Sequence, residues 1–376
     1  MQRELVVLSV FGTRPEAIKM APLVRQLERA EGIRSLVCVT AQHRQMLDSV
    51  MAQFALKADY DLNLMKSGQT LTSITTGVLE GMDGVLENCT PDLVLVHGDT
   101  TTSTAAALAA FYHQVAVGHV EAGLRSHDRY SPFPEEMNRV LTGRLATLHF
   151  APSEGSRENL LREGITEHVH VVGNTVIDAL RMMVHDGYSF HDPALASLPL
   201  DEGRWILMTA HRRENLGAPL ESICRAVRRL VQDNPWLHVV YPVHPNPRVR
   251  ETAFAVLGDT PRVHLIDPVE VEDMHNLIRR CDLVMTDSGG LQEEAPALGK
   301  PVIVLRTETE RPEVVEAGLA LLAGVEEDSV YAAGSLLLHD SGVYHRMSHA
   351  VNPYGDGHAA EKITAILQQY RHALAD

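Results

Sequence analysis

Two apolar runs separated by one short helix constrain the fold of this 376-residue chain more than any other feature. Residues 92–96 are apolar and β-branched, which predicts a fully buried strand, and residues 115–120 predict a second one. The Ala- and Leu-rich segment at 105–112 predicts a helix between them. Because this order forms a βαβ unit, the two strands are expected to run parallel, with their carboxyl ends at one edge.

Acidic residues follow both of these strands. Asp99 comes just past the first strand and Glu121 just past the second, where open α/β sheets place their ligand sites. Pro134 then opens a predicted helix with Glu135 and Glu136 in its first turn. Three acids near one crevice are costly unless their protons are used or cations neutralise them. The pattern therefore indicates a site that moves protons or holds cations.

Strands alternate with helices in both halves of the chain. The first series runs from a strand at 5–11 to one at 168–172, and the second from a strand at 205–209 to one at 302–305. Regular alternation predicts mostly parallel sheets that are covered by helices on both faces. The predicted fold class is therefore α/β, with two doubly wound, Rossmann-like domains that face each other across a cleft.

The division into domains follows from a change of character at 175–203, where loops and prolines interrupt the alternation. The sequence PDLVLVHGD at 91–99 also resembles CDLVMTDSG at 281–289, which indicates two similar halves. We expect an N-terminal domain at 1–174, a C-terminal domain at 175–355, and a helix at 356–376 that packs back on the first domain.

Charge and cysteines narrow the functional class. A formal net charge of -16 argues against binding to nucleic acid, which needs a basic face, but leaves room for one anionic ligand. The four cysteines are scattered without a CxxC pair, which is typical of reduced core thiols in a cytoplasmic protein. A strand begins almost at the N-terminus and no apolar stretch reaches transmembrane length, so neither a signal peptide nor a membrane partner is expected.

Ser288, Gly289 and Gly290 join a buried strand to the N-terminus of a predicted helix. Two glycines allow close backbone approach, and free amides together with the helix dipole favour an anion such as phosphate. Glu294, one turn into the helix, is placed to bind a ribose diol, and Arg311 beyond the next strand supplies positive charge. The alternative is a plain tight turn with Glu294 in solvent. The phosphate interpretation is favoured over it.

Basic residues and histidines follow other strands. Arg14 leaves the end of the first strand and Lys19 lies about one helical turn further, so both are expected to reach the cleft, with surface solvation as the alternative. His211 and Arg212 follow the first strand of the second series, and His244 follows the next strand. A histidine beside arginines and a phosphate site suits general acid catalysis or phosphate binding. In a chain with 20 histidines, a structural role is the alternative for each.

A metal site is a further alternative. His97, Asp99, His119 and Glu121 have the residue types of a site that bridges neighbouring strands. Because the strands end near these residues, strand alternation does not hold each histidine–acid pair on one face. No metal is therefore predicted. Ser288 is also disfavoured as a nucleophile, since neither a GxSxG elbow nor an adjacent base accompanies it.

Several long motifs occur in the order of one known family: FGTRPEAIKMAP, TAQHRQML, VHGDTTT, GHVEAGLR, SPFPEEMNR, TAHRREN, TDSGGLQEEAP, TERPE and NPYGDG. Together they resemble the bacterial non-hydrolysing UDP-N-acetylglucosamine 2-epimerases over nearly the whole chain. The resemblance implies the two-domain GT-B fold, a homodimer, and no metal or nicotinamide cofactor. It also implies interconversion of UDP-N-acetylglucosamine and UDP-N-acetylmannosamine, with UDP as a third bound partner.

The resemblance further implies a mechanism and the residues that carry it. In that family the C2 proton is removed while UDP leaves from C1, and UDP re-adds to a 2-acetamidoglucal with C2 inverted. Asp99, Glu121 and Glu135 correspond to the acid–base carboxylates and His211 to the essential histidine. The positions that correspond to substrate contacts are Arg14, Lys19, Ser288, Gly289, Gly290, Glu294 and Arg311.

Many relatives in that family bind a second UDP-N-acetylglucosamine as an activator. The positions that match this site are Gln42, His43, Gln45, Gln69, Arg212 and His244. Where some relatives carry an arginine, this chain has Gly68, so activation is expected to need a higher activator concentration.

Two alternatives to this function stay open. One is a hydrolysing epimerase or another GT-B nucleotide-sugar enzyme, and the other is a catalytically silent nucleotide-sugar sensor. The family's product feeds ManNAc-type sugars into cell-surface polysaccharide, and the sequence leaves open which polysaccharide.

Overall fold

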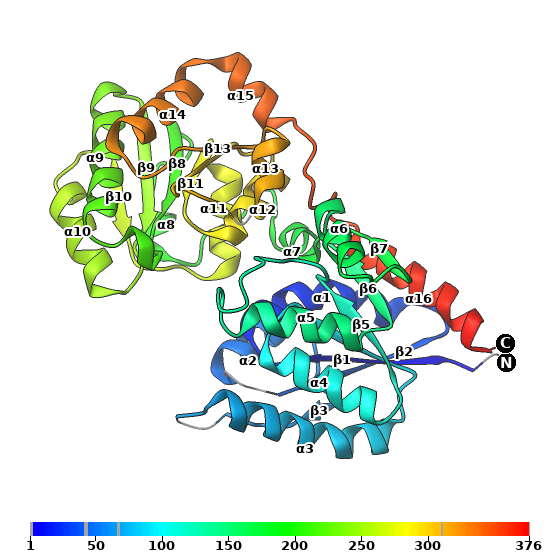
Figure 1. Cartoon of the computed structure of the whole chain (residues 1–376). Coiled ribbons are helices and arrows are strands. Elements are labelled where there is room, and N and C mark those ends of the chain that lie inside the picture. The colour runs from blue at the N-terminus through cyan, green and yellow to red at the C-terminus, as the bar shows by residue number, and fades with distance from the viewer. Residues whose placement is uncertain (1–2, 41–43, 66–67, 310, 376) are drawn as a thin grey trace. The chain divides into compact units, whose positions relative to one another are not determined.

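The computed structural model describes residues 3–40, 44–65, 68–309 and 311–375. The chain forms two compact units, of which the first comprises Met1–Ala179 with Tyr354–Asp376 and the second Leu180–Pro353. Each unit contains one parallel sheet with helices around it, which confirms the predicted α/β class (Figure 1). Within the described ranges, no helix is both long enough and apolar enough to cross a membrane.

The sheet of the first unit has the strand order β3-β2-β1-β4-β5-β6-β7. Its strands are β1 (Leu5–Phe11), β2 (Ile33–Val39), β3 (Tyr60–Asp61), β4 (Leu93–His97), β5 (Ala116–Val120), β6 (Leu148–Ala151) and β7 (Val169–Val171). Its helices are α1 (Arg14–Arg29), α2 (Arg44–Gln53), α3 (Leu71–Cys89), α4 (Thr101–Tyr112), α5 (Glu135–Leu145), α6 (Glu154–Arg162) and α16 (Ala359–Ala375), and α7 (Thr175–Met183) continues into the second unit. Every residue of β4 is buried, as expected for a central parallel strand with both faces covered.

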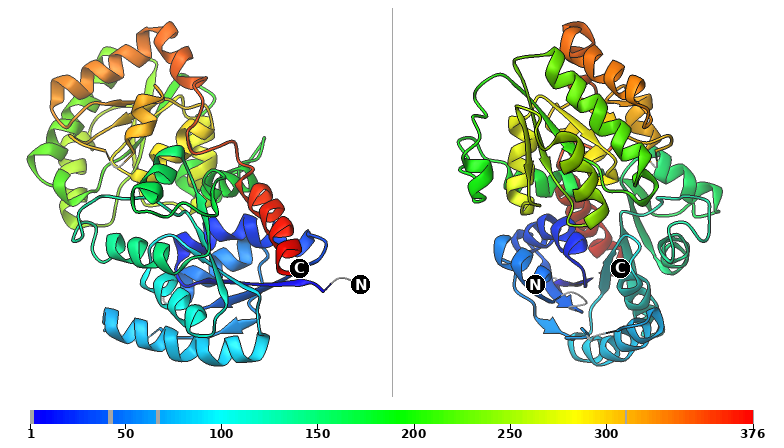
Figure 2. Two further views of the ribbon diagram at one scale, coloured as in Figure 1. Left: turned by 45° about the vertical axis from the view of Figure 1, so that its right-hand side comes forward. Right: turned by 90° about the vertical axis from the view of Figure 1, so that its left-hand side faces the viewer.

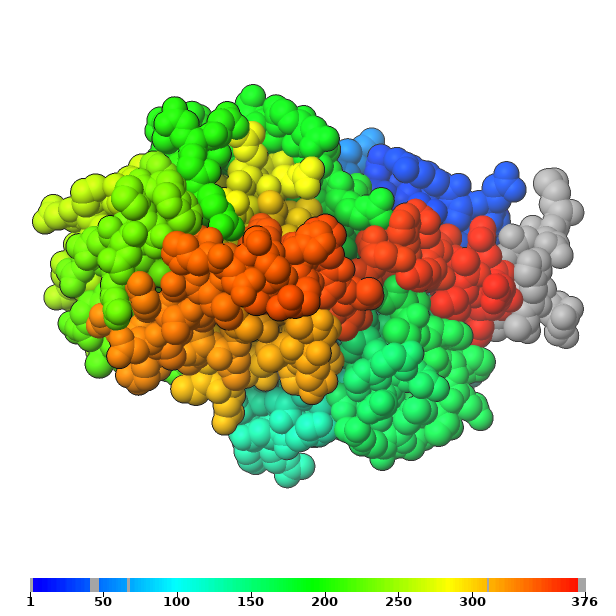
Figure 3. Space-filling view, turned by 90° about the horizontal axis from the view of Figure 1, so that it is seen from above, coloured from blue at the N-terminus to red at the C-terminus, as the bar shows by residue number. Residues whose placement is uncertain are grey.

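The C-terminal helix α16 belongs to the first unit and packs against α1, which Figure 2 shows from two sides. Two contacts fix the chain where it re-enters this unit. The Tyr354 carbonyl accepts the Asn174 N–H at 2.7 Å, and the Asp178 carboxylate accepts the Ala360 N–H at 2.8 Å. Figure 3 shows α16 on the surface beside the segment that contains α6 and β7, and these three elements line a shallow groove.

The sheet of the second unit has the strand order β10-β9-β8-β11-β12-β13. Its strands are β8 (Arg204–Thr209), β9 (Leu237–Pro242), β10 (Val263–Ile266), β11 (Leu283–Thr286), β12 (Val302–Val304) and β13 (Ala320–Leu322). Its helices are α8 (Pro193–Ala196), α9 (Ala218–Asp233), α10 (Pro247–Leu257), α11 (Val271–Arg280), α12 (Gly289–Ala297), α13 (Pro312–Glu316), α14 (Glu327–His339) and α15 (Ser341–Ser348), with a short 3-10 helix at Arg213–Asn215. Helices α9 and α14 approach closely at Gly334, where a Cβ would lie 2.5 Å from a methyl carbon of Leu230.

Both sheets reverse their strand order at the corresponding place. The chain moves outward from β1 to β3 and then returns to β4 on the other side of β1, and it repeats this path with β8, β10 and β11. Open α/β sheets bind ligands outside the carboxyl ends of the strands at such a reversal point. Ligand-binding residues are therefore expected in the loops after β1, β4 and β5 and in the loops after β8 and β11.

The two similar nine-residue sequences have the same structural role at the opposite edge of each sheet. Asp92, just before β4, accepts the Val6 N–H at 2.8 Å and an Arg3 guanidinium hydrogen bond at 2.8 Å. Asp282, just before β11, accepts the Trp205 N–H at 2.7 Å. Each aspartate therefore ties the amino end of one central strand to its neighbour.

Several element boundaries differ from the sequence prediction. Helix α4 begins at Thr101 rather than at 105, because the Thr100 hydroxyl caps it by accepting the Ser103 N–H at 3.0 Å. The strand β6 and the helix α6 were not predicted at all. Strand β6 has four residues, Leu148–Ala151, which is too short for the alternation pattern to stand out.

Candidate active site

A buried carboxylate joins the loops of the first unit at its reversal point. Glu16 is 2% exposed and lies in the first turn of α1, where it forms a capping box with Thr13. Its carboxylate accepts the N–H groups of Gly12 and Thr13 at 3.1 and 2.8 Å. It also accepts the hydroxyls of Thr100 and Ser103 at 2.6 and 2.9 Å. Glu16 therefore holds the loop after β1 against the loop after β4.

Glu121, which directly follows β5, has a strained backbone conformation, and its carboxylate is paired with a cation. Its carboxylate accepts hydrogen bonds from the Lys19 ammonium on α1 and, at 3.1 Å, from the Asn174 side-chain amide. Glu121 is 8% exposed and has a φ of 63°, in the left-handed region that non-glycine residues rarely adopt. Gly98 makes room for it, since a Cβ there would lie 3.1 Å from Glu121 Oε2. A strained, buried, paired carboxylate is typical of a functional site.

Asp99, after β4, is the second acid at this edge. Its carboxylate is 2.6 Å from Arg139 on α5, and its carbonyl accepts the Asn138 amide at 2.9 Å. Burial raises the pKa of Asp99 and the charge of Glu121 raises it further, while Arg139 and Lys19 lower it. The protonated form of Asp99 is thereby favoured relative to an aspartate in water, which suits a group that gives and takes protons.

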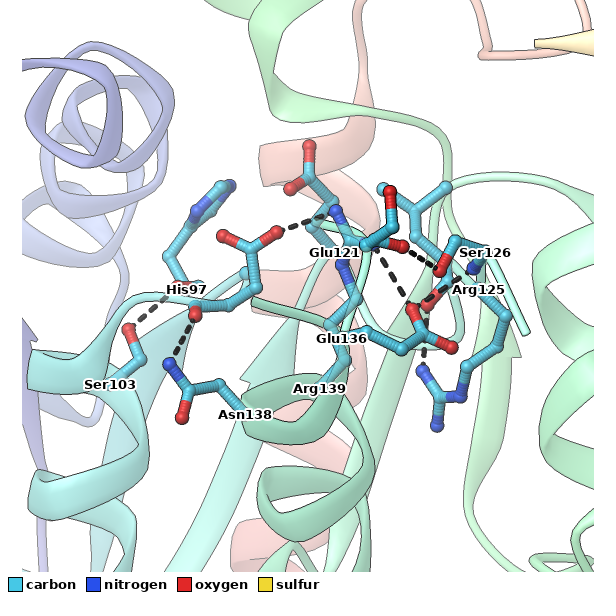
Figure 4. Close-up of polar contacts among 12 residues, drawn as sticks. His97, Ser103, Glu121, Arg125, Ser126, Glu136, Asn138 and Arg139 are labelled. Carbon is cyan, nitrogen blue, oxygen red and sulfur yellow. Dashed lines mark hydrogen bonds and ion pairs between the residues drawn. The ribbon is translucent and has the colours of Figure 1, made fainter. Parts of the chain in front are cut away.

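The two glutamates at the start of α5 have different surroundings. Glu136 is buried and accepts the N–H groups of Ser126 and His127 at 2.9 and 3.0 Å, and Arg139 lies 3.3 Å away (Figure 4). It therefore holds the loop that precedes α5. The Oε2 atom of Glu135 is buried and has no hydrogen-bond partner. Of the pair, Glu135 is the one whose buried carboxylate oxygen has no partner in the described structure.

The histidines near these acids are neutral core residues. Burial lowers the pKa of His97 to about 4 and that of His119 to about 3. His119 donates from Nε2 to the Gly98 carbonyl at 2.7 Å. Among the residues that the structure describes, no group of three or more His, Cys, Asp or Glu side chains is placed to hold a metal ion.

The second unit also has a buried carboxylate at its reversal point. Asp287, directly after β11, is fully buried, and its Oδ2 accepts the N–H groups of His211 and Arg212, both at 2.8 Å. The same oxygen accepts the Asn215 amide at 3.0 Å, while Oδ1 lies 3.4 Å from His211 Nδ1. The turn that follows β8 is therefore held against the end of β11.

Two guanidinium groups flank the N-terminus of α12. Ser288 is the N-cap residue, but its side chain makes no capping hydrogen bond. A Cβ on Gly289 would lie 3.7 Å from Arg212 Nη2 and 4.0 Å from Arg311 Nη2. Arg311 is oriented by an ion pair with the buried carboxylate of Glu293. Backbone amides, the helix dipole and two arginines together suit a phosphate group.

Other predicted residues surround this helix start. A Cβ on Gly290 would lie 3.4 Å from Glu294 Oε1, so this carboxylate lies beside the glycine turn. Glu294 Oε2 is 3.4 Å from the buried His275. The rings of His211 and His244 lie with their centroids 5.0 Å apart, and exposed His244 accepts the Asn246 N–H at Nδ1.

The residues predicted for an activator site are only partly described. Gln42 and His43 lie outside the described residues, as does the side chain of Gln45, whose backbone is in α2. Gln69 donates to the Leu64 carbonyl at 2.6 Å. Its neighbour Gly68 has a φ of 72° and open space around it.

Sequence reasoning missed the residues that orient these acids and the histidine. Glu16 had a signal, because Thr13 followed three residues later by a glutamate is the pattern of a capping box. Arg139 and Asn174 had none, since they meet Asp99 and Glu121 only through folding, and Asn174 is 53 positions from its partner.

Comparison with known proteins gives one family. Residues 25–368 match the family model described as UDP-N-acetylglucosamine 2-epimerase. The UDP-N-acetylglucosamine 2-epimerase of Bacillus subtilis is 56% identical over 366 residues, which cover 97% of this chain and 95% of the relative. That of Salmonella typhimurium is 51% identical over 375 residues, covering 98% and 100%. The crystal structure of the UDP-GlcNAc 2-epimerase from Neisseria meningitidis bound to UDP-GlcNAc has a TM-score of 0.86 at 47% identity, covering 97% and 100%. The chain therefore belongs to the UDP-N-acetylglucosamine 2-epimerase family.

Proposed function

We propose that this protein interconverts UDP-N-acetylglucosamine and UDP-N-acetylmannosamine by inverting C2 of the sugar. The observation that carries the proposal is the pairing of two carboxylates with two cations at one sheet edge, Glu121 with Lys19 and Asp99 with Arg139. Family membership supports the substrate, because the Neisseria meningitidis relative binds UDP-GlcNAc and the Staphylococcus aureus relative binds UDP.

The proposed reaction begins with removal of the C2 proton. Glu121 acts as the base, because the Lys19 ammonium stabilises its ionised form. The C2–H electron pair becomes the C1–C2 double bond of a 2-acetamidoglucal, while the C1–O bond breaks and its electrons leave with UDP. Asp99, whose pKa is raised by burial, returns a proton to the other face of C2 as UDP re-adds to C1. Glu135 is the third acid, with a buried oxygen left for the sugar.

Loss of UDP places negative charge on its diphosphate, and the second unit supplies the groups that stabilise it. The amides at Gly289 and Gly290 and the guanidinium groups of Arg212 and Arg311 are proposed to bind the phosphates. His211 lies beside this helix start through its contact with Asp287. Glu294 is assigned to the ribose hydroxyls, and Arg14 in the first unit to the substrate.

Three properties of the family are proposed for this chain as well. The first is assembly as a homodimer, and the second is delivery of ManNAc-type sugars to cell-surface polysaccharide. A second UDP-N-acetylglucosamine is proposed to activate the enzyme through the six positions that match that site, with weaker binding because Gly68 offers no charge. Gly68→Arg should lower the half-activating concentration roughly tenfold. Backbone strain of an arginine at a φ of 72° reduces this gain. An unchanged half-activating concentration in the reverse reaction would contradict this explanation.

The reaction class is tested by NMR of the purified protein with UDP-N-acetylglucosamine. Appearance of the anomeric signal of UDP-N-acetylmannosamine, together with the reverse conversion from that sugar, is the expected result. Release of free N-acetylmannosamine would instead identify a hydrolase. An unchanged spectrum alongside measurable UDP binding would identify a sensor and overturn the proposal.

A further inference from the structure

Asp287 has hydrogen bonds that divide cleanly between its two oxygens. Oδ2 accepts two backbone N–H groups, from His211 and Arg212, and the amide of Asn215. Oδ1 faces the Nδ1 atom of the His211 ring at 3.4 Å. Because Oδ2 already has three donors in a fully buried site, the carboxylate has little freedom to turn. Oδ1 is therefore held toward the imidazole.

This arrangement determines which ring nitrogen of His211 carries the proton. An ionised carboxylate only accepts hydrogen bonds, so the nitrogen that faces Asp287 has to be the donor. In neutral His211 the proton is then on Nδ1, and Nε2 is left as the acceptor. Hydrogen bonds of catalytic pairs are often long in unliganded proteins and shorten when the ligand is bound.

We propose that Asp287 is a positioning residue that fixes His211 in the Nδ1-protonated tautomer, so that Nε2 is the nitrogen that exchanges a proton at the bound diphosphate. The part played by Nε2 rests on the proposed function, whereas the tautomer does not. Asp287 also holds the backbone of Arg212 through the same oxygen, and the guanidinium of Arg212 lies beside Gly289. One buried carboxylate thus contacts both the ring of a proton carrier and the backbone of a phosphate-binding residue.

The charged and titratable groups that face His211 act in opposite directions on it. Burial lowers the pKa of His211, and His244 and Arg212 lower it further, while Asp287 raises it. The ring is therefore neutral at pH 7 in the unliganded protein. A diphosphate anion at the start of α12 adds negative charge, which favours uptake of a proton at Nε2.

The tautomer is read directly from the ring ¹⁵N chemical shifts of His211 at pH 7.5, assigned by the loss of its signals in His211→Gln. The wild type should show a protonated Nδ1 and an unprotonated Nε2. In Asp287→Asn, the amide oxygen keeps the three donors and the NH₂ group faces Nδ1, so the proton should move to Nε2. Loss of the orienting carboxylate should lower kcat by about 10²-fold or more while UDP affinity changes by less than about threefold.

Asp282→Asn is the matched control, because Asp282 flanks the other end of β11 and also accepts a backbone N–H of β8. It should leave both the tautomer and kcat unchanged. A wild-type His211 with the proton on Nε2 overturns the proposal even if Asp287→Asn does not fold. The same ¹⁵N pattern in wild type and folded Asp287→Asn also overturns it. If the tautomer switches as expected but no epimerisation occurs, the proposed function fails and the role of Asp287 stands.

Discussion

Both units use a buried carboxylate to connect two loops at the point where the strand order reverses, but the two carboxylates have chemically different partners. In each, a buried acid ties together the loops after the two strands where the sheet order reverses, Glu16 across β1 and β4, and Asp287 across β8 and β11. The partners of Glu16 are backbone amides and hydroxyls, none of which titrates near pH 7. One partner of Asp287 is an imidazole. The same topological position therefore gives a purely structural anchor in one unit and a means of setting a proton in the other.

The units also differ in the charges that they place at this edge. The first unit combines acids with single cations, as in the Glu121–Lys19 pair. The second unit combines two arginines with the glycine-containing N-terminus of α12. The first arrangement suits proton transfer and the second suits an anion. The comparison indicates that the first unit carries out proton transfer and that the second binds the anion. Separate mutations in each unit can test this assignment.

Acid should destabilise the first unit more than the second. Burial lowers the pKa values of His97, His119 and His149 to about 4, 3 and 4, against 6.5 for the unperturbed ring. Below pH 6.5 these three histidines bind protons in the unfolded chain but stay neutral in the folded protein. The free energy of unfolding therefore falls as the pH drops, and it stops falling only below the folded pKa values. Each contributes about 1.4 kcal/mol per pH unit in that window.

Hydrogen exchange followed by mass spectrometry separates the two units in this experiment. Between pH 7 and 5, peptides from β4, β5 and β6 should lose more protection than those from β8 and β11, after correction for intrinsic exchange. His149→Gln, which has no ring to titrate, should reduce the difference. Burial also lowers the pKa of His238 and His264 in the second unit. Unchanged protection of β4, β5 and β6 between pH 7 and 5 would therefore be the result that contradicts the assignment of His97, His119 and His149 as neutral core residues.

Glu121→Gln should abolish most of the turnover without affecting nucleotide binding. Loss of a general base lowers rates by about 10²-fold or more, whereas the groups assigned to UDP lie in the second unit. Steady-state kinetics and calorimetric titration with UDP measure the two effects. Asp92→Asn is the control, because Asp92 holds β1 at the opposite end of β4 and should change stability only. Turnover within about threefold of wild type in Glu121→Gln would remove this residue from the mechanism.

Glu16→Gln should have the smallest effect and sharpen the contrast with Asp287. The glutamine oxygen can accept the two backbone N–H groups, and its NH₂ can face Thr100 and Ser103, whose hydroxyls rotate and become acceptors. We expect a loss of about 1 kcal/mol in unfolding free energy and less than about tenfold in kcat. A loss of turnover as large as that of Asp287→Asn would show that the two anchors are not different in kind.

The sequence predicted the strands and helices well where the pattern is long. Strand β1 has the predicted bounds, and the strands predicted at 115–120 and 205–209 each begin within one residue of β5 and β8, because buried parallel strands carry their signal locally. Short elements such as β6 were missed, since four residues are too few to show a period. The ends of the strands also located the acids, as parallel strands bring their carboxyl ends to one edge.

What the sequence could not supply was the pairing of those acids. Asp99 and Arg139 come from different elements, and no local pattern relates them. Asp287 directly precedes the Ser288-Gly289-Gly290 turn in the sequence. Its role, however, depends on a hydrogen bond from the backbone N–H of His211, which lies 76 positions away. Such partners are brought together by tertiary contacts, and the periodicity of a single sequence gives no sign of which residues will meet.

Deuterium incorporation at C2 tests the central claim most directly. In ²H₂O the protein should convert UDP-N-acetylglucosamine into UDP-N-acetylmannosamine that carries deuterium at C2, and the recovered substrate should gain deuterium as the reaction approaches equilibrium. Glu121→Gln should slow exchange and epimerisation by the same factor. Formation of UDP-N-acetylmannosamine that retains its original C2 proton would contradict proton removal by these carboxylates.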